Sequence, residues 1–464
     1  MRTESMKKLE SNPSVIEDQE NDHMRTVIEA YSRFIPREVF GLIGKDTITS
    51  VELGDQVEKT MSSLFSDIRG FTSLSEDMTP QENFDFINAY LKQMEPVISR
   101  HGGIIDKYIG DAIMALFPGS ADDALHSAIS MLKQLSSYNE NRSRSGNSPI
   151  QIGIGINTGI MMLGIIGGIH HMESTVISDA VNLASRMESM TKNYRTPLLI
   201  SEHTYYSLQD SSIFDIRFID RVKVKGKEQC QSVYEVFDAD PPLLRNIKRT
   251  TKGVFEEALA HYHFKEIPRA MELLSECLRQ TPDDTVAQTY YNRCEHFLTT
   301  GTHESSGEVN LTIKWDSTFA IGHPEIDAQH HDLFEHANSF VKAIQKGGNY
   351  SELYSIIEFL NDYVARHFET EEKCMEEMGY PFLQLEIDQH RRFSRYFEAF
   401  KEEIRKDLDV HRSFLLFRAQ ILVIDWLANH TIKLDRHFGR FIWITQTNIT
   451  GNKERQHGKK EFIP

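Results

Sequence analysis

Cysteine is scarce in this sequence, and positive charge is outweighed by negative charge. Only four cysteines occur among the 464 residues, and no two of them form a C-x-x-C pair. This spacing excludes a disulfide framework and a zinc knuckle, and it indicates reduced thiols in a cytoplasmic protein. The 51 Lys and Arg residues face 68 Asp and Glu residues, which gives a formal net charge of -17. Nucleic acid is therefore not expected as a partner, because a phosphate backbone requires clustered positive charge.

Long apolar runs are also missing. Residues 1–23 contain no apolar core of the kind that a signal peptide needs, and we expect a disordered leader there. Residues 152–169 are largely apolar, but they contain six glycines and the polar pair Asn157 and Thr158. Because Ile alternates with Gly in this stretch, it predicts a buried β-hairpin and no membrane span.

Two aspartates follow buried strands in the first half of the chain. In the stretch FSDIRGFT, Asp67 ends an apolar strand just before Phe71 and Thr72 begin a helix. In GGIIDKYIGDAIMALF, two apolar runs flank a Gly-Asp turn that carries Asp111. Either aspartate alone is more often a turn or capping residue. As a pair between buried strands, they favour a two-metal site for attack on a phosphate.

Two further stretches carry polar residues that would be unremarkable alone. STVISDAVNLASRMESM predicts a helix that starts at Asp179 and places Asn182 and Arg186 on one face. RVKVKGKEQCQSVYEVF predicts two strands joined by a glycine turn that bears Lys225. Taken singly, such residues are usually solvated surface groups.

Together, in this order, these four stretches resemble the catalytic domain of the class III nucleotidyl cyclases over about residues 55–238. The resemblance implies a ferredoxin-like βαββαβ domain, which we place at residues 59–240. It also implies that two magnesium or manganese ions are held by Asp67, Asp111 and the backbone carbonyl of Ile68. By the same resemblance, Asn182 orients the ribose, Arg186 stabilises the transition-state phosphorus, and Lys225 binds the terminal phosphates. Phe71 and Thr72 are also expected to bind the substrate.

Base recognition in the family depends on two positions, which are Lys107 and Thr175 here. Lys with Asp or Thr is typical of adenylyl cyclases, and Thr resembles the subgroup of cyanobacterial and bicarbonate-responsive enzymes. The resemblance therefore implies conversion of ATP to cyclic AMP and pyrophosphate, with a guanylate cyclase as the alternative. Family members share each site between two protomers, so one complete residue set implies a homodimer.

The regions around the cyclase stretch are less distinctive. Residues 24–58 begin with helical periodicity and resemble the short transducing segment that often precedes such domains. Residues 250–299 predict two helices separated by TPDD, similar to a single tetratricopeptide repeat. Stacking requires several repeats, so we expect a short helical connector. Residues 446–464 are expected to form a tail.

Histidines crowd the last third of the chain, where nine of the twenty lie between residues 311 and 445. Amphipathic helices at about 325–345, 351–376, 382–406 and 412–438 predict an up-and-down four-helix bundle. The chain is thus expected to be multidomain, with α+β and all-α parts. The candidate ligands on the four helices are His330; His367 and Glu371; Glu386 and His390; His430 and Asp435.

The spacing of these candidates points to metal. Residues four apart share one face of a helix, whereas His430 and Asp435, five apart, would diverge by about 140° on an α-helix. That looser spacing suits two metal ions better than one. A bundle interior does not accommodate three carboxylates and four imidazoles without a cation among them. Histidines with bridging carboxylates favour a non-haem di-iron centre over manganese or zinc.

The stretch from Trp315 to Phe441 resembles the bacterial hemerythrins in IKWDSTFAIGHPEIDAQHHDLF, HFETEE, MGYP and WLANHTIKLDRHF. The resemblance implies that Glu371 and Asp435 bridge two irons and that His330, His367, His390 and His430 are terminal ligands. Glu386 departs from the pattern, because the family normally has His there.

A hemerythrin-like centre in a cyclase chain predicts an iron-based sensor of oxygen, nitric oxide or redox state that regulates cyclic AMP synthesis. One alternative is an oxygen or iron storage module fused to an uncoupled cyclase. Another is a degenerate cyclase that serves only as a dimer scaffold, although every catalytic residue type of the family occurs in the sequence.

Overall fold

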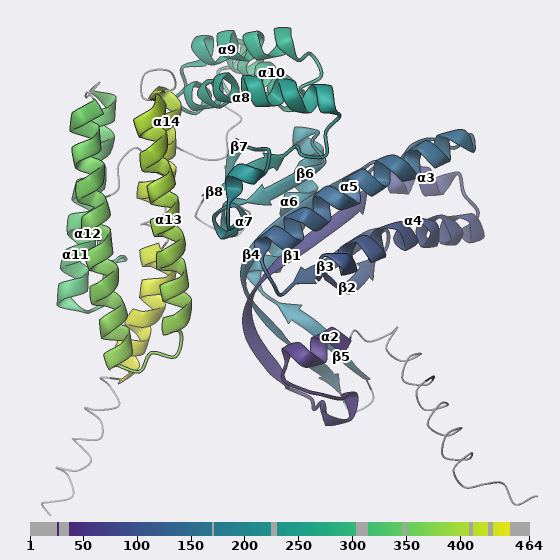
Figure 1. Ribbon diagram of the computed structural model, residues 1–464, viewed down its shortest axis with the longest axis horizontal. Coiled ribbons are helices and arrows are strands. Elements are labelled where there is room, and N and C mark those ends of the chain that lie inside the picture. Colours follow the sequence, from purple (N-terminus) through teal and green to yellow (C-terminus); the bar gives the residue numbers. More distant parts are fainter. Residues whose placement is uncertain are drawn as a thin grey trace, which may run out of the picture. The chain divides into compact units, whose positions relative to one another are not determined.

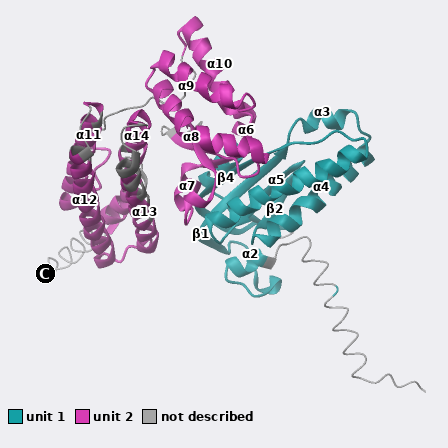
Figure 2. Ribbon diagram, turned by 45° about the horizontal axis from the view of Figure 1, so that its top comes forward, with its two compact units in different colours: residues 1–188 teal, residues 189–464 magenta. Residues whose placement is uncertain are grey.

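The computed structural model describes the chain from residue 37 onward with several gaps. The chain divides into two compact units, residues 1–188 and 189–464 (Figure 2). The described residues are 26, 37–168, 171–223, 230–302, 314–346, 350–407, 412–425 and 430–445. The expected leader, most of the first half of the transducing segment and the tail lie outside these residues. Within the described part of the chain, no helix is long and apolar enough to cross a membrane.

The first unit is built on an antiparallel sheet with the strand order β2-β3-β1-β4. Its strands are β1 (Gln56–Ile68), β2 (Ile104–Ile109), β3 (Ala112–Phe117) and β4 (Ile152–Gly168). Helix α4 (Pro80–Arg100) follows β1, and α5 (Ala121–Arg144) follows β3. This βαββαβ sequence and strand order confirm the predicted ferredoxin-like domain.

Local sequence signals start both long helices of this unit. Thr79 accepts from the amide of Glu82, whose side chain returns to the Thr79 backbone, and Ser120 forms the same capping box with Asp123. Such boxes satisfy amides that a helix N-terminus otherwise leaves unpaired. Before β1, the described part of the transducing segment forms a short helix, α2 (Arg37–Leu42), and a 3₁₀ turn, η1 (Ile48–Ser50).

The prediction of a hairpin within residues 152–169 was wrong. Residues 152–168 form one long strand, β4, which pairs with β1 and then, near its C-terminal end, with β5 (His171–Ile177). The glycines serve close packing instead of a turn. A Cβ atom at Gly155 would lie 2.0 Å from the backbone nitrogen of Glu188 and 2.5 Å from the carbonyl oxygen of Ala184. Only glycine lets helix α6 (Asp179–Tyr194) approach the strand so closely.

The second unit begins with β6 (Leu198–Ser201), β7 (Ile216–Lys223) and β8 (Cys230–Val236). Strand β8 pairs antiparallel with both β6 and β7. A short helix, α7 (Glu202–Ser207), follows β6, and a 3₁₀ turn, η2 (Ser211–Ile213), precedes β7. The boundary between the units therefore falls inside the predicted cyclase domain.

The connector has three helices where the sequence predicted two. They are α8 (Pro242–His263), α9 (Ile267–Gln280) and α10 (Thr285–Thr300). The TPDD stretch separates α9 from α10 as predicted. The additional break lies at Lys265, whose φ of 63° is left-handed, just before Pro268 in the first turn of α9. Apolar spacing continues across this turn, which explains why the sequence pattern concealed it.

The helices of the C-terminal bundle lie side by side in Figure 1. Helices α11 (Pro324–Gln345), α12 (Tyr350–Glu377) and α13 (Leu383–Asp407) agree with the predicted bounds to within two residues. The fourth predicted helix is irregular. It starts as α14 (Arg412–Ala419) and continues into the π-helical segments η3 (Gln420–Asp425) and η4 (Thr431–Asp435), and residues 436–445 are helical again.

Candidate metal centres

The first candidate centre lies in the first unit, where β1 ends beside the β2–β3 turn. Gly110, with a φ of 65°, closes that turn directly before Asp111. The Asp111 carboxylate accepts a hydrogen bond of 3.2 Å from the amide of Ile68, one residue after Asp67. Burial, and then a hydrogen bond and the charge of Asp67, raise the pKa of Asp111 to about 6. The structure thus brings both predicted aspartates together.

The turn after Asp67 positions the next two predicted residues. Gly70 has a φ of 66°, which permits the chain to enter helix α3 (Phe71–Glu76) at once. Phe71 stacks on Phe86 with ring centroids 6.1 Å apart, and Thr72 is exposed.

The two predicted base-recognition residues lie on neighbouring parts of the first unit. The ammonium group of Lys107 lies 3.3 Å from the carboxylate of Glu173 and 3.4 Å from that of Asp106. Glu173 and Thr175 are two residues apart on strand β5, so they share one face of that strand. Lys107 therefore reaches the strand face that carries Thr175. The sequence did not predict its contact with Glu173.

The remaining predicted catalytic residues are not gathered around these aspartates. Asn182 is exposed and Arg186 is half-buried on the same face of α6. Among the described residues, neither side chain makes a hydrogen bond or an ion pair with Asp67 or Asp111. Lys225 lies outside the described residues.

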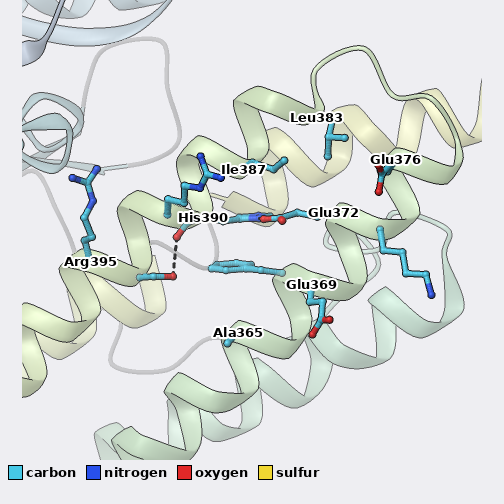
Figure 3. Close-up of a pocket in the computed structure, with 12 residues that line it drawn as sticks. Ala365, Glu369, Glu372, Glu376, Leu383, Ile387, His390 and Arg395 are labelled. Atoms are coloured by element: carbon cyan, nitrogen blue, oxygen red, sulfur yellow. Dashed lines mark hydrogen bonds and ion pairs between the residues drawn. The ribbon is translucent and has the colours of Figure 1, made fainter.

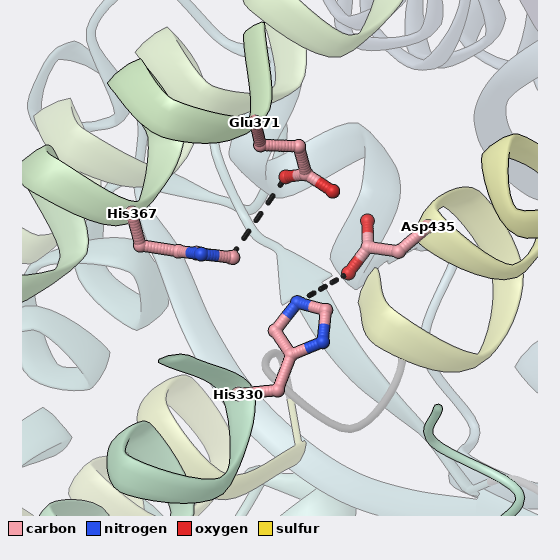
Figure 4. Close-up of side chains that lie close together, drawn as sticks. All are labelled: His330, His367, Glu371 and Asp435. Carbon is pink, nitrogen blue, oxygen red and sulfur yellow. Dashed lines mark ion pairs between the residues drawn. The ribbon is translucent and has the colours of Figure 1, made fainter. Parts of the chain in front are cut away.

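The second candidate centre is inside the C-terminal bundle, and all seven predicted ligands are buried there. They are His330, His367, Glu371, Glu386, His390, His430 and Asp435. Figure 4 shows four of these side chains pointing toward one another from three segments. The imidazole of His330 lies 3.1 Å from the Asp435 carboxylate, and that of His367 lies 3.8 Å from the Glu371 carboxylate (Figure 4).

Glu371 and Asp435 also face the other histidines. Glu371 Oε2 lies 3.4 Å from His390 Nε2, and Asp435 Oδ1 lies 3.2 Å from His430 Nε2. The two imidazole nitrogens of His390 and His430 are themselves only 3.1 Å apart. Glu386 joins this side, because ligand atoms of Glu386, His430 and Asp435 lie within 4.8 Å of one another. The two carboxylates therefore stand between two groups of histidines.

The predicted divergence of His430 from Asp435 was wrong. Their connecting segment, η4, is π-helical, and the i to i+5 hydrogen bonds of a π-helix bring residues five apart closer to one side than an α-helix does. His430 and Asp435 thus converge on one point, 3.2 Å apart, where an α-helix would separate them. Single π turns inside helices are frequent at functional sites. Sequence spacing alone could not reveal this change of period.

The chemistry of the cluster fits a metal. Among the described residues, several of its buried polar atoms have no hydrogen-bond partner: both imidazole nitrogens of His330, both carboxylate oxygens of Glu371 and of Asp435, and Oε2 of Glu386. Buried polar groups are costly when unpaired and are otherwise almost always satisfied. Nitrogen and carboxylate donors around a common centre are the ligands that iron and similar metals accept.

The electrostatics of the cluster point the same way. Burial, and then the charge of Asp435, raise the pKa of Glu371 to about 7. Burial and the same two neighbouring carboxylates raise the pKa of Glu386 to about 9. Burial alone would raise the pKa of Asp435, but His430 and His330 outweigh this effect and hold that pKa well below its usual range. Carboxylates this crowded repel one another, and a bound cation would relieve that repulsion.

Two residues that the sequence analysis missed support the histidines from outside. Nδ1 of His367 lies 3.0 Å from the side-chain oxygen of Gln329, and Nδ1 of His390 lies 2.7 Å from the Glu372 carboxylate. Such partners fix the ring orientation of ligating histidines. Phe368 adds a parallel stack on His390, with ring centroids 3.8 Å apart. Gln329 directly precedes the predicted ligand His330, and Glu372 directly follows Glu371. Each contacts a histidine on a different helix, and the sequence does not show which helices pair.

A groove runs along α12 and α13 up to this supported histidine. Its volume is about 850 Å³, and Glu372 and His390 are part of its lining. Figure 3 shows Glu369, Glu372 and Glu376 on one wall and Ile387, His390 and Arg395 on the other. The Glu372–His390 pair therefore separates the buried cluster from this groove.

Both candidate centres fall within segments that match known protein families. Residues 54–236 match the model of the adenylate and guanylate cyclase catalytic domain, and residues 322–440 match that of the hemerythrin HHE cation binding domain. The chain therefore contains a domain of each family, as the sequence motifs predicted.

Individual relatives match through the cyclase half. An adenylate cyclase of Anabaena cylindrica is 44% identical over 219 residues, which are 46% of this chain and 44% of that protein. A terminal-differentiation specific adenylate cyclase of Dictyostelium discoideum is 38% identical over 269 residues, which are 57% of this chain and 13% of that protein. The chain thus spans less than half of the length of these curated relatives.

Solved structures are similar over the same region. The adenylyl cyclase CyaB from P. aeruginosa is 32% identical, with a TM-score of 0.36, over 39% of this chain and 95% of that chain. The guanylyl cyclase Cya2 is 33% identical, with a TM-score of 0.35, over 41% of this chain and 97% of that chain.

Proposed function

We propose that the protein is an adenylate cyclase whose activity is regulated by an iron centre in its C-terminal bundle. One observation carries the proposal: a chain with a cyclase domain also contains a buried cluster of seven metal-ligand side chains, several of whose polar atoms have no hydrogen-bond partner among the described residues. The relatives named adenylate cyclase support ATP as the substrate and cyclic AMP and pyrophosphate as the products. A cytoplasmic location remains a prediction.

In this proposal, Asp67, Asp111 and the carbonyl of Ile68 hold two magnesium or manganese ions. Bound there, these ions supply charge neutralisation and lower the pKa of the ribose 3′-hydroxyl. The adjacency of Asp111 to the β1 end, through its contact with the Ile68 amide, supports this role. Phe71 and Thr72, at the following helix start, are proposed to contact the substrate.

The nucleotide would be oriented by the other predicted residues. Lys107 and Thr175 recognise the adenine edge, Asn182 orients the ribose, and Arg186 stabilises the negative charge that develops at phosphorus. Lys225 is proposed to meet the terminal phosphates. Exchange of Lys107→Glu together with Thr175→Cys should shift use from ATP toward GTP, because the donor and acceptor pattern is reversed.

We further propose a homodimer in which each site takes its metal ligands from one protomer and Asn182 and Arg186 from the other. The exposure of large apolar side chains on the β4–β5 arm supports such an interface, since exposed apolar groups gathered on one element indicate association. These side chains are Ile166, Met172 and Ile177. Among the described residues of one chain, Asn182 makes no hydrogen bond with Asp67 or Asp111, which is consistent with sharing.

For the bundle, we propose that Glu371 and Asp435 bridge two irons, and that the four histidines and Glu386 are the remaining ligands. The placement of both carboxylates between the two histidine groups supports the bridging role. Bound there, the irons would supply sensitivity to oxygen, nitric oxide or redox state. Gln329 and Glu372 would hold the rings of His367 and His390 in ligating orientation.

The test compares cyclase rates of the full chain in its ferrous, ferric and metal-stripped forms, anaerobically and then with oxygen or nitric oxide. ATP and GTP are supplied in parallel, and Asp67→Ala protein measures the background. A rate that changes with iron state supports regulation. Equal rates in all three forms, with iron shown to be bound in the ferrous and ferric forms, would favour an uncoupled storage module. No product from either nucleotide would favour a scaffold.

A further inference from the structure

The irregular fourth segment of the bundle begins on the connector, not on the bundle itself. The first amides of α14 donate to the carboxylate of Glu257 on α8: the Ser413 amide at 3.3 Å and the Phe414 amide at 2.8 Å. A helix normally leaves its first amides unpaired or caps them with its own side chain. Here the cap comes from a residue more than 150 positions earlier in the chain.

A histidine completes this cap. Nε2 of His261 lies 3.3 Å from the hydroxyl of Ser413 and 3.4 Å from the carboxylate of Glu257. The other ring nitrogen pairs with Glu266 at 2.5 Å. Burial acts to raise the pKa of Glu257, but its bonds to His261 and to the α14 amides lower it overall. The negative charge of Glu257 is therefore suited to the positive end of the α14 dipole.

One turn further on, Phe417 packs into an aromatic group at the same place. Its ring is fully buried and stacks on His263 with centroids 4.9 Å apart and planes 12° apart. It also meets Phe218 of strand β7 edge-on at 5.1 Å. Phe218 in turn donates its amide to the carboxylate of Glu256, at 3.1 Å. Helix α14 thus contacts both the connector and β7.

The connector is fixed to β7 and β8 by buried ion pairs. Arg217 of β7 is fully buried, and its guanidinium makes bonds of 2.6 and 2.7 Å to Asp284 and of 2.5 Å to Glu235 of β8. Lys248 of α8 adds a bond of 2.9 Å to Glu235. A movement of α8 would therefore be transmitted to these two strands. In the sequence, Lys225 lies between them.

The far end of the same segment carries metal ligands. After α14, the chain continues through η3 and η4 to His430 and Asp435. Leu415, Ala419 and Leu422 pack into the apolar core of the bundle along the way. Residues 412–425 thus contact the connector at their start and pack into the bundle core over Leu415 to Val423. Because packed interiors are not compressible, a shift of this core on metal binding would displace α14 at the connector.

We infer that Glu257 and Phe417 form the coupling contact through which the state of the iron centre reaches the cyclase strands β7 and β8. Metal binding at His430 and Asp435 shifts the segment that starts at α14, and Glu257 and Phe417 pass this shift to α8 and β7. This inference rests on the proposed regulation, but the contact itself exists whether or not the enzyme responds to iron.

The test uses full-length Glu257→Ala and Phe417→Leu proteins. Matched controls are Glu272→Ala and Phe359→Leu. Glu272 is an exposed connector carboxylate that pairs with Arg269 on its own helix, and Phe359 is an exposed aromatic of the bundle. Two readouts are taken for each protein with and without iron: the cyclase rate, and backbone hydrogen exchange of α8, β7 and β8.

In the parent and both controls, we expect iron removal to change exchange in α8 and β7 as well as in the bundle. In Glu257→Ala and Phe417→Leu, the change should be confined to the bundle while iron content and absorption stay the same. The ratio of cyclase rates with and without iron should move toward one. Unchanged α8 and β7 exchange in the parent would overturn the inference. If iron removal changes exchange in α8 and β7 of the parent but leaves its cyclase rate unchanged, the coupling contact stands and only the proposed regulation is contradicted.

Discussion

At the residue scale, Glu386 raises the sharpest chemical question. Its carboxylate is buried beside His430 and Asp435, where the hemerythrin pattern would supply a neutral imidazole. A third carboxylate adds negative charge to the centre, and hard anionic oxygen ligands favour ferric over ferrous iron. A centre with this ligand should oxidise readily, which suits a redox or nitric oxide sensor better than an oxygen carrier.

Glu386→His should therefore raise the reduction potential of the centre and slow its autoxidation. We expect a shift of at least about 59 mV, which is tenfold in a one-electron equilibrium. Redox titration followed by absorption gives the potential, and the decay of reduced protein in air gives the rate. Asp388→His, on the exposed side of the same helix, is the matched control. If both substitutions leave potential and rate at the parental values with iron bound, Glu386 is not a ligand.

Asp111 supplies a prediction about pH. Its folded-state pKa of about 6 is raised, so it takes up a proton as the pH falls through that value. A protonated carboxyl group does not bind a metal, so magnesium affinity is retained above about pH 6 and is lost below it. We expect the dissociation constant for magnesium, measured by calorimetry on the full chain, to rise about tenfold per pH unit below this point. A constant affinity between pH 7 and pH 5 would contradict this.

The sequence identified individual ligands better than their outer partners. His367 and Glu371, or Glu386 and His390, reveal themselves through a spacing of four, because helical periodicity acts within one segment. Gln329 and Glu372 contact histidines on other helices, so their roles depend on how the helices pair. Glu173, which meets Lys107, depends in the same way on the pairing of β4 with β5.

At the element scale, regular elements were predictable and departures from one period were not. The bounds of α11 to α13 follow from apolar spacing and, for α11 and α12, from the glycines that come after each helix in the sequence. The π turn of η4, which lies between His430 and Asp435, changes the angle between these two side chains, and a spacing of five residues in the sequence does not reveal it. Likewise, the glycines of β4 signalled a turn by composition, whereas their function at Gly155 is to admit a helix.

The buried pairs of β7 and β8 with the connector yield a stability prediction. Arg217→Ala would leave Asp284 and Glu235 buried without their main partner, which typically costs about 3–5 kcal/mol. We expect the opening free energy of β7 and β8 amides, from hydrogen exchange, to fall by this amount. Arg269→Ala, which removes an exposed pair with Glu272, should change it by less than about 1 kcal/mol. Similar effects of both substitutions would show that the buried network does not stabilise these strands.

At the scale of the whole molecule, the sequence motifs located both families correctly but not the division into compact units. The boundary at residue 188 falls inside the matched cyclase segment, so β7 and β8 share a unit with the connector and the bundle. Motifs report local chemistry, whereas compactness depends on contacts such as that of Arg217 with Asp284, 67 residues apart. Whether the cyclase site needs a second chain likewise depends on which site residues stay apart within a single chain.

That separation leads to a test of the shared site. Asp67→Ala and Arg186→Ala proteins should each be inactive, because each homodimer carries the lesion in both of its sites. In an equal mixture, random pairing makes half of the dimers heterodimers, and each of these has one site free of both lesions. Cyclic AMP synthesis should therefore return to about a quarter of the parental rate.

The matched control for this mixture combines two lesions from the same half of the site. When Asp67→Ala is mixed with Asp111→Ala, each site in a heterodimer still lacks one metal-binding aspartate, so activity should not return. Heterodimer formation is verified in both mixtures by differently tagged chains. If heterodimers form with Arg186→Ala and the mixture stays as inactive as its parents, each site is built within one protomer. The exposed side chains of the β4–β5 arm would then need a different explanation.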